Sequence, residues 1–291
     1  MSNTLNLNDE LGPNWAHLLL LAALPPYAWW AQQAAWPAGL SLALATLAAL
    51  VWLMAWERWR PLRRDWQPSR AELREDARSL GLNALVDALA DLALNASLLV
   101  LLAGRAPAAW WSALPAWLGL PLLIALGELA PFALHRWAHR SALGWRFHGL
   151  HHRPQTLNAA NSVLVHPVNL LWNKLARTLV WALLAAPAHW LLWAALFMQV
   201  QSLAVHANVR GRLGWLNYLI GTAELHRWHH SVRLDEAHNY GTAVPLWDQL
   251  FGSFVYRPGA QPQQLGWSVD EDAATLSPAA ATARPCCLPG R

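Results

Sequence analysis

The fold is decided by two short stretches of sequence, "FHGLHH" at residues 147–152 and "LHRWHHS" at residues 225–231. Both contain the pattern His-x-x-His-His, in which the first histidine lies about one helical turn before the other two. The adjacent histidines differ by about 100° around a helix axis, so they face different directions. Such a pair suits two neighbouring metal ions, one each, better than a single ion. The six residues are His148, His151, His152, His226, His229 and His230.

A further histidine pair precedes these stretches in "ELAPFALHRWAHR", residues 128–140. His135 and His139 are four residues apart, which stacks them on one face of a helix within reach of one metal region. Glu128 lies seven residues before His135, on the same stripe of the helix. We expect its carboxylate to orient a ligand imidazole through the second ring nitrogen, or to balance the charge of bound ions. Glu128 is therefore a candidate catalytic residue.

The remaining histidines are more scattered along the chain. His206, in "VHANVRG", follows an apolar helix, and a lone histidine in such a place is commonly a packed or interfacial residue. By spacing, His166 in "LVHPVN" and His238 in "EAHNYG" are weaker metal-binding candidates. His17 and His189 have no partner in the sequence, and we assign them to a membrane interface.

The composition indicates a protein that lies in lipid. Hydrophobic residues make up 55% of the 291 residues and charged residues only 13%, whereas soluble domains carry about a quarter. We predict an all-α, polytopic integral membrane helical bundle of about four spans, with a histidine-rich helical cap on its cytoplasmic side. A proline pair at residues 25–26 should kink or split the first span. The four expected spans are residues 15–36, 39–56, 80–102 and 111–134.

The charges predict the orientation of these spans. Arginines are concentrated at residues 57–78, and Lys174 is the only lysine. A basic loop of this kind is typical of the cytoplasmic side, and four spans then leave every histidine cluster on that side. The net charge of +4 comes from residues that flank apolar spans, so we do not expect nucleic-acid binding. Residues 168–200, interrupted by Pro187, should form a hairpin or two half-buried helices.

The third expected span carries polar residues four positions apart on one helical face. Three interpretations stay open at this point: support for a metal site, a polar seam between helices, or the solvated face of a partly interfacial helix. The residues are Asn83, Asp87, Asp91 and Asn95.

The sequence predicts three parts. Residues 1–110 comprise the N-terminal spans and the arginine-rich loop, residues 111–256 the catalytic region, and residues 257–291 a disordered tail rich in proline and alanine. The polar start of the chain lacks the basic segment of a secretory signal, so we expect the first apolar stretch to be retained. Cys286 and Cys287 are adjacent in the tail and cannot staple the fold.

In these motifs the sequence resembles the fatty acid hydroxylase/sterol desaturase superfamily of membrane-bound, non-haem di-iron oxygenases. The resemblance covers residues 122–256 and rests on "HRWAH", "FHGLHH", "VHPVN", "VHANV", "LHRWHHS" and "HNYGTAVPLWDQLFGSF". The ordered series is specific for the superfamily and unspecific for any member. The closing motif, which includes Asn239, Tyr240, Gly241, Trp247, Asp248 and Gly252, looks structural.

The resemblance also implies a set of iron ligands. Some members have a further histidine four residues before His206, where this chain has Ser202. Water or His166 would then complete the set, whereas His238 falls where members vary. The implied ligands are His135, His139, His148, His151, His152, His206, His226, His229 and His230.

Many nitrogen ligands without a thiolate suit iron, zinc or copper. A structural zinc site needs only four ligands, so this number fits two ions with open positions. The resemblance implies two iron ions that use O2 to hydroxylate or desaturate an unactivated C–H of a lipid, such as a sterol or a fatty acyl chain. Electrons would come from a separate donor, a cytochrome or ferredoxin. The arginine-rich loop would dock this donor or simply set the topology.

Other functions compete with this one. A related aldehyde-processing or ring-hydroxylating enzyme would share the scaffold. A membrane metal transporter, or a metal-binding protein without oxygenase activity, would also use histidines, although transporters place ligands near the middle of their spans. A bis-histidine haem protein needs isolated histidines in facing helices, which clustered pairs do not provide.

Overall fold

The computed structural model describes residues 11–101 and 108–267, with side chains throughout except at residues 95–101. Within these ranges the chain forms helices and isolated bridges but no strand, which confirms the all-α class. Short 3-10 helices lie at Arg64–Trp66, Ala109–Ala113, Ala160–Val163 and Gly214–Tyr218. The α-helices are α1 (Trp15–Gln33), α2 (Ala38–Trp59), α3 (Arg70–Leu101), α4 (Ala116–Arg140), α5 (Ala142–His152), α6 (Pro167–Leu183), α7 (Ala188–Ala204), α8 (Ala223–His229) and α9 (Leu246–Leu250).

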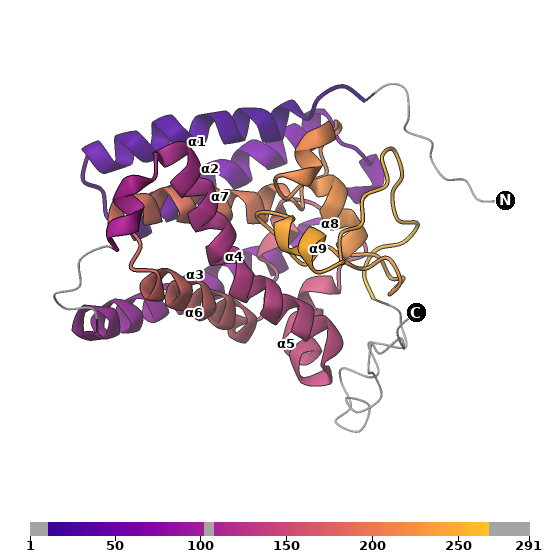
Figure 1. The fold of residues 1–291 in the computed structure, drawn as a ribbon. Coiled ribbons are helices and arrows are strands. Elements are labelled where there is room, and N and C mark those ends of the chain that lie inside the picture. The colour runs from indigo at the N-terminus through magenta and orange to yellow at the C-terminus, as the bar shows by residue number, and fades with distance from the viewer. Residues whose placement is uncertain (1–10, 102–107, 268–291) are drawn as a thin grey trace.

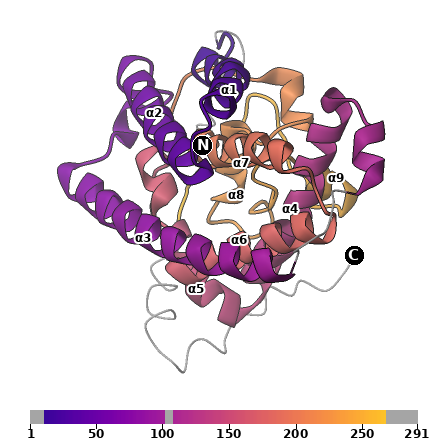
Figure 2. The same cartoon turned by 90° about the vertical axis from the view of Figure 1, so that its left-hand side faces the viewer.

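Helix α7 lies near the centre of the bundle, surrounded by the other long helices (Figures 1 and 2). It packs against α1, α2 and α4, while α6 lies along α4 and α3. Buried apolar residues from three helices, among them Ala16, Leu53 and Val200, share one core. This core joins the N-terminal helices to the histidine-bearing part, so the two fold together.

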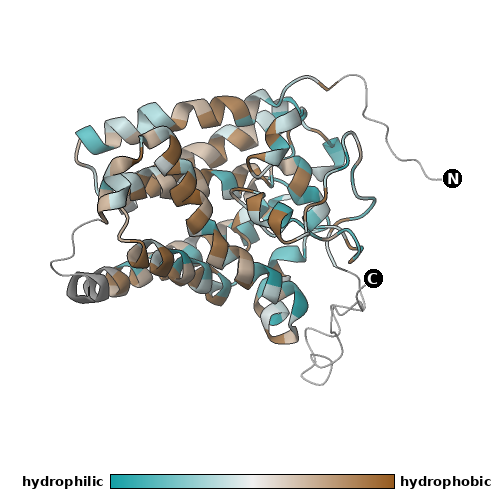
Figure 3. Cartoon of the chain, viewed as in Figure 1, coloured by the Kyte–Doolittle hydropathy of each residue, from teal (hydrophilic) through white to brown (hydrophobic). Residues whose placement is uncertain are grey.

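Among the residues that the structure describes, two helices, α2 and α4, are long and apolar enough to cross a membrane. Large apolar side chains also lie on the outside of the bundle: Val51 is 69% exposed, Trp117 76% and Leu183 73%. Such outward-facing apolar residues fit contact with lipid. Hydrophobic residues follow the bundle helices, whereas the loops beside α8 and the end of α5 are largely hydrophilic (Figure 3). The count of about four spans and the cytoplasmic position of the cap stay predictions.

Prolines act differently in the two apolar regions where the sequence suggested a break. Pro25 and Pro26 lie inside α1, which continues to Gln33, so the first apolar stretch is one helix and is not split. In contrast, Pro187 is the N-cap of α7 and separates it from α6. The expected pair of helices at residues 168–200 is therefore found.

The polar face of α3 is a seam between helices. The Nζ of Lys174, on α6, lies 2.7 Å from a carboxylate oxygen of Asp87 and 2.7 Å from one of Asp91. The Nδ2 of Asn83 donates to the backbone carbonyls of Val163 and Val165. These contacts fix α3 against α6 and the segment before it. The side chain of Asn95 lies outside the described residues.

Part of the expected disordered tail is ordered. Within residues 257–267, Leu265 is buried and Gly266 N donates to His230 O at 3.0 Å. Arg257 pairs with Glu236 and stacks over the Trp228 ring. The prediction of disorder from residue 257 is therefore wrong for residues 257–267. This segment packs against α8 and the residues that follow it. Residues 268–291 lie outside the described residues.

Candidate metal centre

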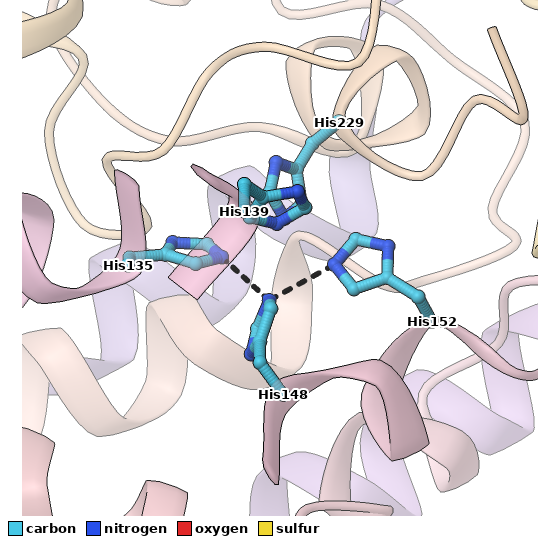
Figure 4. A group of neighbouring side chains, drawn as sticks. All are labelled: His135, His139, His148, His152 and His229. Carbon is cyan, nitrogen blue, oxygen red and sulfur yellow. Dashed lines mark hydrogen bonds between the residues drawn. The ribbon is translucent and has the colours of Figure 1, made fainter. Parts of the chain in front are cut away.

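Nine histidines gather into two groups inside the bundle (Figure 4 shows the first). Each histidine of a group contributes one ring nitrogen, and these nitrogens all lie within 4.8 Å of one another. The five-histidine group draws its members from α4, α5 and α8. The four-histidine group draws its members from α5, from α8 and its C-cap, and from the turn that follows α7. The five-histidine group is His135, His139, His148, His152 and His229; the four-histidine group is His151, His206, His226 and His230.

A sharp turn brings the first two helices of the site together. Ser141 ends α4 and begins α5, and its hydroxyl accepts a hydrogen bond from Gly144 N at 3.2 Å. A Cβ on Gly144 would lie only 2.5 Å from the Ala138 Cα, so the close approach requires glycine here. The turn sets the His135 ring 4.5 Å, between centroids, from the His148 ring.

The two members of each adjacent histidine pair belong to different groups. The rings of His151 and His152 are at 90° to each other, and those of His229 and His230 at 88°. The groups are also neighbours, since the ring centroids of His152 and His230 are 4.2 Å apart in a stacked arrangement. The angular separation expected from helical spacing is thus present, and it divides the histidines between two centres.

The outward ring nitrogens are held by fixed acceptors. The Nδ1 atoms of four histidines lie against backbone carbonyls: His135 on Tyr240 O at 2.6 Å, His151 on Leu164 O at 3.3 Å, His206 on Ser202 O at 2.9 Å and His229 on His238 O at 2.9 Å. A carbonyl only accepts, so each Nδ1 carries the proton and each Nε2 keeps its lone pair. His148 Nδ1 similarly lies 2.7 Å from Asn169 Oδ1.

The inward Nε2 atoms face one another at close range. The distance is 2.9 Å between His135 and His148 in the first group, and 3.1 Å between His151 and His206 in the second. Because each of these atoms presents a lone pair, they repel unless a cation lies between them. The buried Nε2 atoms of His139 and His229 have no hydrogen-bond partner within the described ranges. Both observations fit metal ligation.

The spacing of the nitrogens bears on the type of ion. Two imidazole nitrogens at right angles on one ion, each about 2.1 Å from it, lie about 3.0 Å apart, whereas tetrahedral ligands lie about 3.4 Å apart. The neighbouring Nε2 contacts within the groups are 2.9–3.1 Å. Neighbouring nitrogens at this spacing can share one ion, and imidazole nitrogens suit iron, zinc, copper or nickel.

Burial keeps these imidazoles neutral. It lowers the pKa of His151 to about 4, from 6.5. It lowers the pKa of His152, His226 and His230 well below 6.5, and neighbouring imidazoles lower it further. Neutral imidazole is the form that binds metal, so the site is ready for a cation at neutral pH.

Two of the predicted site residues lie apart from the groups. His166 caps α6, where its Nδ1 accepts from Val168 N at 3.1 Å, and the structure does not bring it to either group. Glu128 is buried, and its Oε1 accepts from Thr242 N and Ala243 N at 2.6 and 2.8 Å. The expectation that Glu128 orients the His135 ring is wrong, because the Nδ1 of that ring is bound to the Tyr240 carbonyl instead.

The closing motif supports the site from behind. The Asp248 carboxylate accepts from Tyr240 N and Gly241 N at 2.8 and 2.7 Å, which fixes the loop whose Tyr240 carbonyl holds His135. Asn239 has a positive φ of 61° and bonds through its side chain to Leu225 O. The structural role expected for this motif agrees with these contacts.

Sequence spacing missed the outer partners of the histidines. Asn169 touches His148 from 21 positions away, and nothing in the local pattern marks it beyond its place in "VHPVN". The carbonyls of Leu164 and Ser202 carry no side-chain signal at all.

Comparison with known proteins agrees with this geometry. Residues 120–253 match the family model described as fatty acid hydroxylase. This region, a little under half of the chain, is similar to the fatty acid hydroxylase family. The chain is also 35% identical over 161 residues to the ornithine lipid hydroxylase OlsE of Rhizobium tropici, which covers 55% of this chain and 47% of that relative. The chain thus matches about half of the length of that protein. No solved structure matches.

Proposed function

We propose that the chain is a membrane-bound hydroxylase of a lipid, in which the two histidine groups hold two iron ions at the cytoplasmic face. The observation that carries this proposal is the pair of adjacent histidine groups, in which Nε2 atoms converge and four of the Nδ1 atoms lie against backbone carbonyls. Nine such ligands exceed what one structural ion needs. The match of residues 120–253 to the fatty acid hydroxylase family supports iron as the metal.

Two irons bound here would supply the activation of O2 for oxidation of an unactivated C–H. The protein holds the ligands rigid and keeps water away. The Tyr240 ring packs against His139 at 5.3 Å, and the Trp145 ring lies 5.3 Å from both His139 and His152. Glu128 has its carboxylate in the same cavity as His135 and is our candidate for balancing positive charge. Electrons would come from a separate cytochrome or ferredoxin.

We favour hydroxylation over desaturation because the matching family and the relative OlsE are both named for hydroxylation. Both reactions begin with removal of one hydrogen, so the same ligands serve either.

The test is a comparison of lipids from cells with and without the gene, by mass spectrometry under ¹⁸O2. We expect a product about 18 mass units heavier than the unmodified lipid, because one ¹⁸O atom is inserted into a C–H bond. His151→Ala and His229→Ala should each abolish this product and lower the iron content. Retained turnover in both variants, or metal flux into proteoliposomes without an oxidised product, would contradict the proposal.

A further inference from the structure

A cavity of about 130 Å³ lies beside the five-histidine group. Helices α4, α6 and α7 and the loop after α8 form its walls, so it lies where a substrate would meet the histidines. The side chains that matter here are His135, Glu128, Asn173, Arg177 and Tyr240.

Two polar atoms on the α6 wall are buried without a hydrogen-bond partner within the described ranges. They are the Nε of Arg177 and the Oδ1 of Asn173. The two residues are four apart and share one helical face. A buried polar atom without a hydrogen-bond partner is costly, and one that lines a cavity can be completed by a ligand in that cavity.

Glu128 and Arg177 attract each other across the cavity, but they form no close ion pair. Glu128 accepts two backbone hydrogen bonds, from Thr242 N and Ala243 N, and no ion pair within 4 Å joins it to Arg177 in the described part of the chain. A guanidinium presents a planar fork that matches a carboxylate with two parallel hydrogen bonds. The Asn173 carbonyl oxygen, beside it, accepts from an N–H.

The size of the cavity limits what enters. A cavity of about 150 Å³ admits one benzene ring, so this space takes a group of a few heavy atoms. A sterol skeleton or an acyl chain would not fit within it. The space and its two unpartnered atoms fit a small polar headgroup.

We propose that Arg177 and Asn173 bind the polar headgroup of the lipid substrate, a carboxylate with a neighbouring N–H, and place it beside His135. This proposal rests on the proposed function, because only a hydroxylase of lipids would have such a substrate. The binding itself does not require turnover. Arg177 is thus a specificity-determining residue, and the substrate class is a lipid with an acyl-amino-acid headgroup. The carboxylate of a free fatty acid offers the same charge without the N–H.

The experiment measures binding in the absence of O2, with the full-length, iron-loaded protein in detergent. Isothermal titration calorimetry compares three probes: N-dodecanoyl-ornithine, its methyl ester and dodecanoic acid. The variants are Arg177→Gln, Arg177→Lys and Asn173→Asp. Lys174→Gln is the matched control, because it removes a cation from the same helix, where Lys174 pairs with Asp87 and Asp91 outside the cavity.

We expect Arg177→Gln to lower the affinity for N-dodecanoyl-ornithine by roughly ten- to hundredfold, which is the range for a hydrogen bond to a charged group. The affinity for its methyl ester should not change. Asn173→Asp should weaken the acid by charge repulsion, and Arg177→Lys should lose part of the affinity. Lys174→Gln should change nothing. If dodecanoic acid binds as tightly as the ornithine probe, the source of the carboxylate is the fatty acid.

If Arg177→Gln lowers the affinities for the acid and for the ester equally, or lowers neither, the assignment is overturned. If Arg177→Gln does not fold, the acid-to-ester ratio in Arg177→Lys and Asn173→Asp decides the matter. Carboxylate-dependent binding without any hydroxylated product would instead refute the proposed function alone.

Discussion

The two histidine groups share neighbouring residues yet differ in their surroundings. All four members of the four-histidine group are buried, whereas two of the five-histidine group, His135 and His139, are partly exposed. Only the five-histidine group has a member, His135, in the cavity of about 130 Å³. Under the proposed function, this difference favours access of the substrate to the five-histidine group, because all members of the other group are buried.

The largest expected effect comes from removing the central histidine of either group. His148 Nε2 contacts those of His135 and His152, and His226 Nε2 contacts those of His206 and His230. His148→Ala and His226→Ala should each abolish turnover and remove at least half of the bound iron, measured by plasma mass spectrometry. His166→Ala, outside both groups, is the control and should keep both properties. Full activity of either variant would show that the corresponding histidine group is not part of the active site.

A smaller effect should follow from removing a residue that supports only one of the two histidine groups. Asn169 holds the Nδ1 of His148, and loss of such an outer partner typically costs ten- to a hundredfold in metal affinity. Asn169→Ala should therefore weaken one of two iron-binding events by that factor in a chelator competition and leave the other alone. Asn173→Ala, one turn further along α6, should leave both unchanged. Equal weakening of the two events would mean that the groups do not bind separately.

Acid should destabilise the metal-free protein. Burial lowers the pKa of His151 to about 4 from its ordinary 6.5, so the unfolded chain binds more protons than the folded chain between these values. Stability is fully present above pH 6.5 and falls as the pH drops towards 4. Melting temperatures in detergent at pH 7.5, 6 and 5 should decrease in that order, and bound iron should reduce the decrease. A flat profile without metal would show that these rings are not buried and neutral.

The smallest effect should come from the seam between α3 and α6. Lys174 pairs with two half-exposed aspartates, and such pairs contribute about 0–1 kcal/mol. Lys174→Met should lower the free energy of unfolding by no more than about 1 kcal/mol and leave the iron content unchanged. A loss of iron from the five-histidine group alone would show that the seam also positions Asn169 on α6.

Much of the site follows from local periodicity. The spacing of His135 and His139, and the divergence of His151 from His152, are properties of a helix and are visible in the sequence. Residues such as Asn169 and Arg177 are not, because each is positioned by packing between helices far apart in the chain. Glu128 shows the limit most clearly: it shares the histidine stripe, yet its carboxylate turns to backbone amides after Tyr240.

The fold shows the same division. Composition predicts helices in lipid, and Pro187 predicts the boundary between α6 and α7. The unbroken course of α1 through Pro25 and Pro26, and the packing of Leu265 over the site, depend on contacts with other helices that single-sequence patterns do not contain.

The most direct test of the central claim is the metal content of the purified protein, measured per chain together with the nitrogen or sulfur character of the ligands by X-ray absorption. Two irons per chain, each surrounded by nitrogen and oxygen only, is the result that paired imidazole centres predict. One ion per chain, or zinc at four ligands, would contradict a two-iron hydroxylase.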